Sequence, residues 1–340
     1  MEIQLRSEDV KVLVNQDLKS NLLTTKNKID DIPDFEWRKF RSLVNKYEGA
    51  TKLDKQKHIS RAYFKLKELM IDDSAKFKNI KRVAALAEGP GGFIKYINDA
   101  YPTAEVFGIS LKEGTEGTNW LMGNLNQDKV KIIYGDDNMF NDGNIYNRYV
   151  ADAYVEKVGK NSVDLVTADG GFQAKDENDK EVEHMKLFLA ETLIALRVLK
   201  KGGSFILKIY DIFTQPTLEM LYLLKNVFKS VQIKKPVSSR PANSERYIVC
   251  HGYQGYDVKG HVNNKATYSS ILKMPRGERE KFTEFVKKLG ELDAPYIQKV
   301  IDSINEAVTF YHVNKHNRLE ISKRKKEQKL YKTAWEQVYN

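Results

Sequence analysis

The stretch KRVAALAEGPGGFIKY, residues 81–96, decides the fold. Its apolar run, residues 83–87, is too short for a helix and predicts a buried strand. A glycine-rich turn follows at residues 89–92, and a helical pattern then starts, because Phe93 and Ile97 share one face. Glycines let a ligand approach the backbone, and the first turn of a helix offers unpaired N–H groups. The stretch therefore predicts a ligand site, with a plain strand-to-helix turn as the alternative.

Short apolar runs and helical patterns alternate along the chain from residue 80 onward. The expected strands are residues 82–87, 105–110, 130–134, 164–168, 204–210, 230–235 and 247–251. The expected helices between them are residues 92–100, 144–158, 184–199 and 216–228. This alternation predicts an α/β domain whose mostly parallel, seven-stranded sheet has helices on both faces. Ligands of such sheets bind beyond the carboxyl ends of the strands.

Polar residues stand where such a ligand would bind. Glu88 follows the first expected strand, Asp136 the third and Asp169 the fourth. Lys208 lies inside the apolar run FILKIYDIF, and Glu245 precedes the last strand. A lysine in a buried strand is costly unless it is paired. Pairs of lysines and carboxylates are often only structural, but their convergence beside a glycine-rich turn favours chemistry.

The composition restricts the partners of the protein. The chain has 340 residues and a net charge of +10, which indicates a polyanionic partner or a solvated basic face. Its 18 tyrosines and 15 phenylalanines suit stacking on bases. The single cysteine, Cys250, excludes an internal disulfide and a cysteine-rich zinc site. No apolar run approaches a membrane span, so we expect an intracellular protein of the nucleus or cytoplasm with no membrane partner.

Five motifs, in this order, resemble those of the FtsJ-like S-adenosylmethionine-dependent RNA 2′-O-methyltransferases. They are RAYFKL around Lys65, GPGGF at residues 89–93, LVTADGGF around Asp169, ILKIYDIFT around Lys208 and SSRPANSERYIVC around Glu245. The resemblance covers roughly residues 58 to 253. The forms ADGGF and SRPANSERY are most similar to the cap-specific mRNA 2′-O-methyltransferases within this group.

The resemblance implies a Rossmann-like methyltransferase fold and a role for each matching residue. The catalytic tetrad would be Lys65, Asp169, Lys208 and Glu245. S-adenosyl-L-methionine, without a metal, would be held by Glu88, Gly89, Pro90, Gly91, Gly92, Phe93, Asp136 and Asp169. The residues expected to contact RNA are Arg61, Tyr210, Ser238, Ser239, Arg240 and Asn243.

Two positions depart from the family pattern. Ala85 stands in the first strand where the family often has an acid, and we expect Glu88, three positions later, to replace it. The second strand ends in ISLK at residues 109–112, without the acid that commonly binds the cofactor ribose. The ribose contacts are therefore left open.

The reaction implied is methyl transfer to the 2′-hydroxyl of the first transcribed nucleotide of capped RNA. The hydroxyl must lose its proton as it attacks the methyl group. Lys208, if deprotonated or strongly polarised by its buried setting, would accept or steer that proton. Asp169 and Lys65 would orient Lys208, and Glu245 would fix the far side. The alternatives are the same reaction on ribosomal or transfer RNA, and a catalytically silent cap- or RNA-binding subunit. Aromatic candidates for stacking on a cap guanine are Phe172, Tyr210 and Phe213.

Both ends of the chain extend beyond the resemblance. We expect residues 1–55 to form an N-terminal extension, residues 56–255 the methyltransferase domain and residues 256–340 a basic helical C-terminal extension. Apolar residues at helical spacing predict two C-terminal helices, around residues 282–289 and 297–311. A further expected helix packs against the core through Trp37, Phe40, Val44 and Tyr47.

The basic run SKRKKEQK, residues 322–329, is equally consistent with RNA binding and with a solvated helix face. Besides capped RNA, other capping or transcription proteins are candidate partners, because a basic tail suits docking in a larger assembly. A compact chain of this kind also suits a virus-encoded enzyme.

Overall fold

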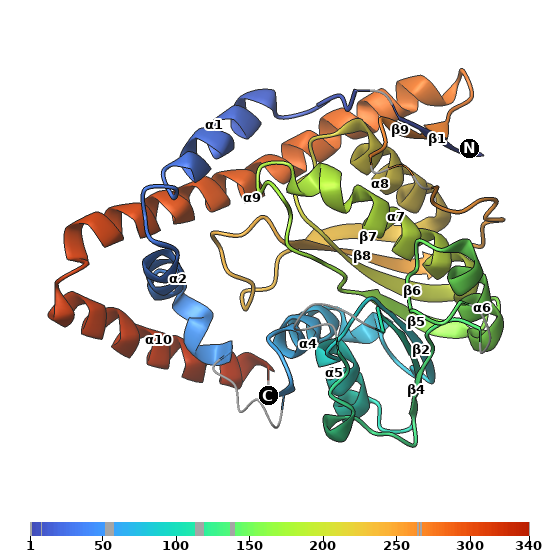
Figure 1. Ribbon diagram of the computed structural model, residues 1–340, viewed down its shortest axis with the longest axis horizontal. Coiled ribbons are helices and arrows are strands. Elements are labelled where there is room, and N and C mark those ends of the chain that lie inside the picture. The colour runs from blue at the N-terminus through green and yellow to red at the C-terminus, as the bar shows by residue number, and fades with distance from the viewer. Residues whose placement is uncertain are drawn as a thin grey trace.

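The computed structural model describes residues 2–7, 9–51, 58–112, 119–136, 140–263, 265 and 267–339. A central sheet of seven strands organises them (Figure 1). Six strands run parallel, and β8 is antiparallel to both of its neighbours. This confirms the expected mostly parallel sheet. The strands, in spatial order, are β4 (Val130–Ile132), β3 (Glu105–Ile109), β2 (Arg82–Leu86), β5 (Val163–Ala168), β6 (Leu199–Ile209), β8 (Arg246–Tyr253) and β7 (Phe228–Lys234).

Helices cover both faces of the sheet, as the alternating pattern predicts. Successive residues of a strand point to opposite faces, and β2 shows this directly: Val83 and Ala85 pack on one side, Ala84 and Leu86 on the other. The first side carries α4 (Ala62–Asp72) and α5 (Gly92–Ala100). The second carries α6 (Arg148–Val158), α7 (Lys180–Val198) and α8 (Gln215–Val227).

The two ends of the chain pack together beside the sheet (Figure 1). Near the N-terminus, β1 (Glu2–Arg6) pairs antiparallel with β9 (Ser270–Lys273). The helical elements of the extensions are α1 (Gln16–Asn27), α2 (Asp34–Leu43), the 3-10 helix η1 (Lys46–Thr51), α9 (Glu278–Asn314) and α10 (Arg318–Tyr339). The helix α1 lies along the long helix α9, and α10 returns to contact α4.

The prediction of two separate helices over residues 282–311 is wrong, because α9 is one helix of 37 residues. Pro295 lies inside it and removes one N–H donor, which normally breaks a helix. Here the residue four positions earlier, Glu291, is exposed, so water can solvate the carbonyl that loses its partner. The middle of α9 is also fixed to the sheet, since Arg246 of β8 pairs with Asp293 at 3.0 Å and both side chains are fully buried.

The N-terminal aromatic residues pack elsewhere than expected. Trp37, Phe40 and Val44 are buried against Val300 and other apolar residues of α9, in a cluster apart from the two that line the sheet. The reason is that helices already cover both faces of the sheet. Tyr47 contacts α10 through an edge-on ring contact with Tyr331, with the ring centres 5.5 Å apart. No helix of the described residues is long and apolar enough to cross a membrane.

Candidate active site

The structure brings the four expected catalytic residues together as two ion pairs. Lys208 projects from β6, and its Nζ lies 3.3 Å from Oδ1 of Asp169, which directly follows β5. The same Nζ donates a 2.6 Å hydrogen bond to the Asp169 backbone carbonyl. Lys65 of α4 donates to both carboxylate oxygens of Glu245, at 2.7 and 2.8 Å. All four side chains therefore meet at the carboxyl edge of the parallel strands.

Tyr247 supports this arrangement, although the sequence analysis did not single it out. It is fully buried, it stands opposite Lys208 in the β6–β8 register, and its hydroxyl donates a 2.9 Å hydrogen bond to Oδ1 of Asp169. Its position two residues after Glu245 is the signal that could have found it, because alternate residues of a strand share a face. Both Lys208 and Tyr247 thus hold Asp169 in place.

The negative charges around Lys208 favour its charged form over its neutral form. Burial acts to lower the pKa of Lys208, but the negative charges of Asp169 and Glu245 outweigh it and hold this pKa above its ordinary value. Paired in this way, the ammonium group is a hydrogen-bond donor aimed at the site. It must lose a proton before it can act as a base.

Glu245 carries the opposite charge under similar constraints. Burial acts to raise the pKa of Glu245, but the positive charges of Lys65 and Lys208 lower it to about 2. The Ser239 hydroxyl donates a further 2.8 Å hydrogen bond to Oε1. Lys235, which the sequence analysis also missed, donates a 2.8 Å hydrogen bond to the Glu245 backbone carbonyl, and burial lowers the pKa of Lys235 to about 7.

These contacts predict that Glu245 makes folding sensitive to acid. Its folded-state pKa lies below the ordinary 4.5, so its charge stabilises the fold above pH 4.5, and this contribution is lost as the pH falls toward 2. The loss amounts to about 3 kcal/mol, at about 1.4 kcal/mol for each tenfold change in proton affinity. Urea unfolding at stepwise lower pH should show this loss in the natural protein and not in Glu245→Gln.

Glu336 of α10, whose side chain is 45% exposed and pairs with Lys332 at 3.7 Å, provides the matched control, because Glu336→Gln leaves the site unchanged. The unfolding free energy of Glu336→Gln should equal that of the natural protein at every pH. If the unfolding free energy of Glu245→Gln depended on pH as strongly as that of the natural protein, the ion pair of Glu245 with Lys65 would be contradicted.

Two further carboxylates lie buried beside Asp169. Glu88 follows β2, and within the described ranges neither of its carboxylate oxygens has a hydrogen-bond partner. Glu191 of α7 is fully buried, and its Oε1 accepts a 3.1 Å hydrogen bond from the Gly170 N–H. Burial raises the pKa of both glutamates well above the ordinary value, and the charge of Asp169 adds to this. The sequence analysis did not single out Glu191; the signal that could have found it is that it is the lone acid in the apolar helical run LFLAETLIAL.

The glycine-rich turn joins β2 to α5 as expected. Gly91 has a φ of +107° and precedes the first residue of the helix. A Cβ built on Gly92 would lie 2.1 Å from Oγ of Ser60, so the turn is packed closely against the start of α4. Gly89 and Pro90 are half-buried, whereas the Phe93 side chain is fully buried and points into the core. The turn therefore offers mainly its backbone to a ligand.

Asp136 lies in a turn after β4, at the same carboxyl edge as the glycine-rich turn. Its backbone N–H donates to the Phe140 carbonyl at 2.9 Å, and its Oδ1 accepts from the Phe140 N–H at 3.0 Å. The side chain is half-buried. Its assignment to the adenine of the cofactor stays a prediction.

The two arginines expected to bind RNA share one partner from the N-terminal extension. Arg61 and Arg240 each donate to Oε1 of Glu48, at 2.8 and 2.9 Å. Arg61 also donates a 2.6 Å hydrogen bond to the Ser238 carbonyl. Glu48 therefore fixes both guanidinium groups beside the Lys65–Glu245 pair, a contact that no local motif indicated.

The other expected RNA contacts differ in accessibility. Ser238 and Ser239 are buried, and Ser239 already bonds Glu245, so both support the loop that precedes β8. Tyr210 is also buried, with the Lys180 Nζ 4.5 Å from its ring centre. Asn243 is half-buried and lines a cleft of about 970 Å³ between α1, α2, α9 and the loops around residues 176 and 242.

The C-terminal helix reaches the same loop. Trp335 of α10 donates a 2.6 Å hydrogen bond from Nε1 to Oε1 of Glu68, and that oxygen accepts a 3.1 Å hydrogen bond from the Ser238 N–H. Both Trp335 and Glu68 are buried. Residues 68 and 335 thus connect α4 and α10 to the loop that carries Ser239 and Glu245.

A sheet of this strand order, with a glycine-rich turn after the inner strand β2, defines a Rossmann-like methyltransferase. Residues 58–253 match the FtsJ-like methyltransferase family, and the chain belongs to this family. Methyltransferases of this family use S-adenosylmethionine. The buried carboxylates Glu88 and Glu191 fit a positively charged ligand of this kind, and the turn at Gly91 fits close approach of a ligand to the backbone.

Several curated relatives are cap-specific mRNA (nucleoside-2′-O-)-methyltransferase 1 proteins. That of Drosophila melanogaster is 30% identical over 308 residues, which cover 84% of this chain and 38% of that protein. That of Homo sapiens is 30% identical over 267 residues, which cover 72% of this chain and 32% of that protein. This chain thus spans about a third of the length of these relatives. Among solved structures, a ribosomal RNA methyltransferase from Plasmodium falciparum matches 58% of this chain and 99% of that one, with 23% identity and a TM-score of 0.42.

Proposed function

We propose that the protein transfers a methyl group from S-adenosylmethionine to the ribose 2′-hydroxyl of the first transcribed nucleotide of capped mRNA. The observation that carries this proposal is the convergence of Lys65, Asp169, Lys208 and Glu245 beside the glycine-rich turn. The names of the relatives, and the forms of the motifs around Asp169 and Glu245, support capped mRNA as the substrate. Other capping or transcription proteins, and a location in the nucleus or cytoplasm, belong to the same proposal.

In this proposal the cofactor is held by the glycine-rich turn and by the acids around it. The backbone of residues 89–92 would contact its methionine part, Glu88 and Asp169 would face its positive charge, and Asp136 would lie near its adenine. S-adenosylmethionine, when bound, supplies a methyl group already activated by a positively charged sulfur. No metal is needed for that activation.

The tetrad would then act on the attacking hydroxyl. Lys208 Nζ would hydrogen-bond the 2′-oxygen, release one of its own protons to water, and then accept the hydroxyl proton as that oxygen attacks. A positive charge brought to the neighbouring turn opposes the charge of Lys208 and promotes that loss. Asp169 and Tyr247 hold Lys208 in place, while Lys65 and Glu245 define the opposite wall.

The RNA end would lie in the cleft of about 970 Å³. Arg240 and Asn243 line this cleft. They lie in the sequence between the buried Ser239 and Glu245, so they can contact the RNA backbone near the tetrad. Of the three aromatic candidates for the cap guanine, Phe213 and Tyr210 are buried and Phe172 is 45% exposed. Phe172 stacks at 3.9 Å on His184, which fixes its ring beside the Gly171 backbone. It is therefore our first choice for stacking on the cap.

Matched short RNAs with and without a methylated cap test the proposal. The capped RNA should be methylated on the ribose of its first nucleotide, and the uncapped RNA much less. Mass spectrometry of the digested product locates the methyl group. Equal methylation of both RNAs, or methylation only at internal positions, would favour ribosomal or transfer RNA. Absence of transfer to any RNA, with the cofactor bound, would favour a silent binding subunit.

A further inference from the structure

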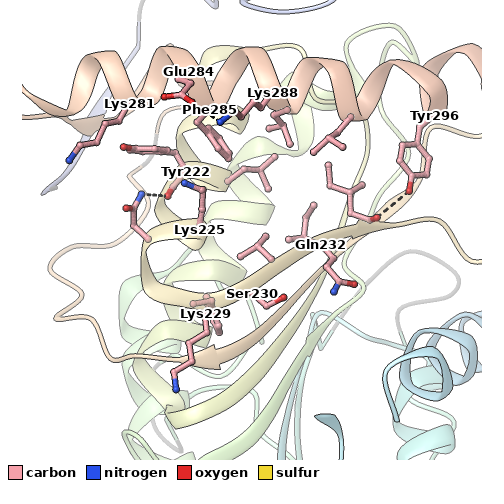
Figure 2. Close-up of a pocket in the computed structure, with 18 residues that line it drawn as sticks. Tyr222, Lys225, Lys229, Ser230, Gln232, Lys281, Glu284, Phe285, Lys288 and Tyr296 are labelled. Carbon is pink, nitrogen blue, oxygen red and sulfur yellow. Dashed lines mark hydrogen bonds and ion pairs between the residues drawn. The ribbon is translucent and has the colours of Figure 1, made fainter. Parts of the chain in front are cut away.

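A second large cavity lies away from the tetrad, and the proposed reaction does not use it. It has a volume of about 840 Å³ and lies between α8, β7 and α9 (Figure 2). We call this cavity the lysine-rimmed groove. Its floor is apolar, formed by Leu221, Val231, Ile248, Phe285 and Leu289. Its volume falls within the range of about 300–1,000 Å³ found for binding pockets.

The groove runs along a free edge of the sheet. β7 is the last strand in the sheet order, and no strand of the described residues pairs with its outer side. The Tyr296 hydroxyl of α9 donates a 3.2 Å hydrogen bond to the Ile233 carbonyl at one end of the groove (Figure 2). In the β7–β8 register the Gln254 N–H donates to the Val227 carbonyl at 2.9 Å, so Val227 and every second residue after it bond β8. Backbone groups of alternate strand residues point to the same side. Those of Ser230 and Gln232 therefore face the free edge, where an added strand would pair.

The rim of the groove is positively charged. Four lysines from three elements line it, against the single acid Glu284. Two of them are paired within α9, since Lys281 contacts Glu278 at 2.9 Å and Lys288 contacts Glu284 at 2.6 Å. Lys225 of α8 and Lys229 of β7 have no carboxylate within 4.0 Å in the part of the chain that the structure describes. The groove thus offers two unpaired cations above an apolar floor.

We propose that the lysine-rimmed groove binds an extended acidic segment of a partner protein, which adds a short strand to β7. Main-chain hydrogen bonds to the outward groups of Ser230 and Gln232 provide affinity in this mode, and alternate side chains provide specificity. Apolar side chains of the segment would enter the floor beside Phe285. Glutamates or aspartates two positions away would point to the same side of the sheet and meet Lys225 and Lys229.

An RNA strand fits the groove less well. Binding of single-stranded RNA relies on exposed aromatic faces for stacking together with a cluster of unpaired cations. Tyr222 is buried, and Phe285 packs against it with ring centres 5.2 Å apart, so no free aromatic face lines the groove among the described residues. Glu284 on the rim would also repel phosphates.

Fluorescence anisotropy with the full chain tests this proposal. The probe is a fluorescein-labelled peptide of about nine residues in which every second position is in turn valine and glutamate, with threonine between them, and its counterpart has lysine in place of glutamate. The acidic peptide should bind at least about tenfold more tightly than the basic one. The double variant Lys225→Glu/Lys229→Glu should weaken its binding about tenfold or more, without changing methyl transfer, because neither lysine touches the tetrad.

Gln232→Pro, with Gln232→Ala as its control, tests the added strand separately. Proline removes the outward N–H and is tolerated at a sheet edge, so peptide binding should be lost only in the proline variant, whose folding circular dichroism verifies. Equal affinity for both peptides, or unchanged affinity in the lysine double variant, would overturn the proposal. Loss of capped-RNA binding without loss of peptide binding in that double variant would also overturn the proposal, because the groove would then bind RNA.

Discussion

Replacing Lys208 by alanine is expected to reduce methyl transfer by about 100- to 10,000-fold, the usual cost of losing a general acid–base group. The structure explains why no neighbour can replace it. Lys65, the other lysine of the tetrad, is held by both oxygens of Glu245, whereas Lys208 faces Asp169 at 3.3 Å. Binding of S-adenosylhomocysteine should be nearly unchanged, because Lys208 acts on the hydroxyl and not on the cofactor.

Radioactive methyl transfer and calorimetric titration measure the two effects independently. Lys201→Ala is the matched control, since Lys201 lies on the same strand but is exposed at its other end. Lys65→Ala and Asp169→Ala should resemble Lys208→Ala. Near-normal turnover in Lys208→Ala would show that the tetrad assignment is wrong.

Replacing Gly91 by valine is expected to weaken S-adenosylhomocysteine binding roughly 100-fold. Gly91 has a φ of +107°, which costs a residue with a side chain about 1–3 kcal/mol. A Cβ there would also lie 3.2 Å from the Leu125 side chain. The turn would relieve this strain by moving away from its present conformation, and the backbone would no longer fit the cofactor.

Gly202→Val separates strain from binding. Gly202 has a similar φ of +84°, and a Cβ built on it meets nothing within 4 Å. Both variants should lose comparable stability in thermal unfolding, but only Gly91→Val should lose affinity in calorimetry. Unchanged affinity in a folded Gly91→Val protein would place the cofactor elsewhere.

The sheet could be predicted because each strand has a local signal. Every expected strand overlaps an observed one, since buried parallel strands are short continuous apolar runs between turns. β6 begins earlier than expected, at Leu199, because α7 ends at Val198 and the chain enters the strand directly. Residues 200–202 of this strand are exposed, so no apolar signal marks its start.

The missed features depend on contacts between distant segments. Apolar spacing alone divided α9 into two helices, and only the buried pair of Arg246 and Asp293 shows what fixes the middle of the single helix. Glu48 lies 192 residues from Arg240 in the sequence, so no spacing rule could connect them. The roles of Lys208 and Asp169 were accessible because a lysine in an apolar strand and an acid after a neighbouring strand are local anomalies.

The contacts of Glu48 and Trp335 affect how small an active fragment of this protein can be. The family match spans residues 58–253 and includes the whole tetrad, yet both of these residues lie outside it. A fragment cut to that span would leave Arg61 and Glu68 facing water in place of their partners. The loop carrying Glu245 would then lose two of its anchors. A minimal active fragment must therefore retain both termini, and a fusion to the C-terminus would lie next to α10 and α4.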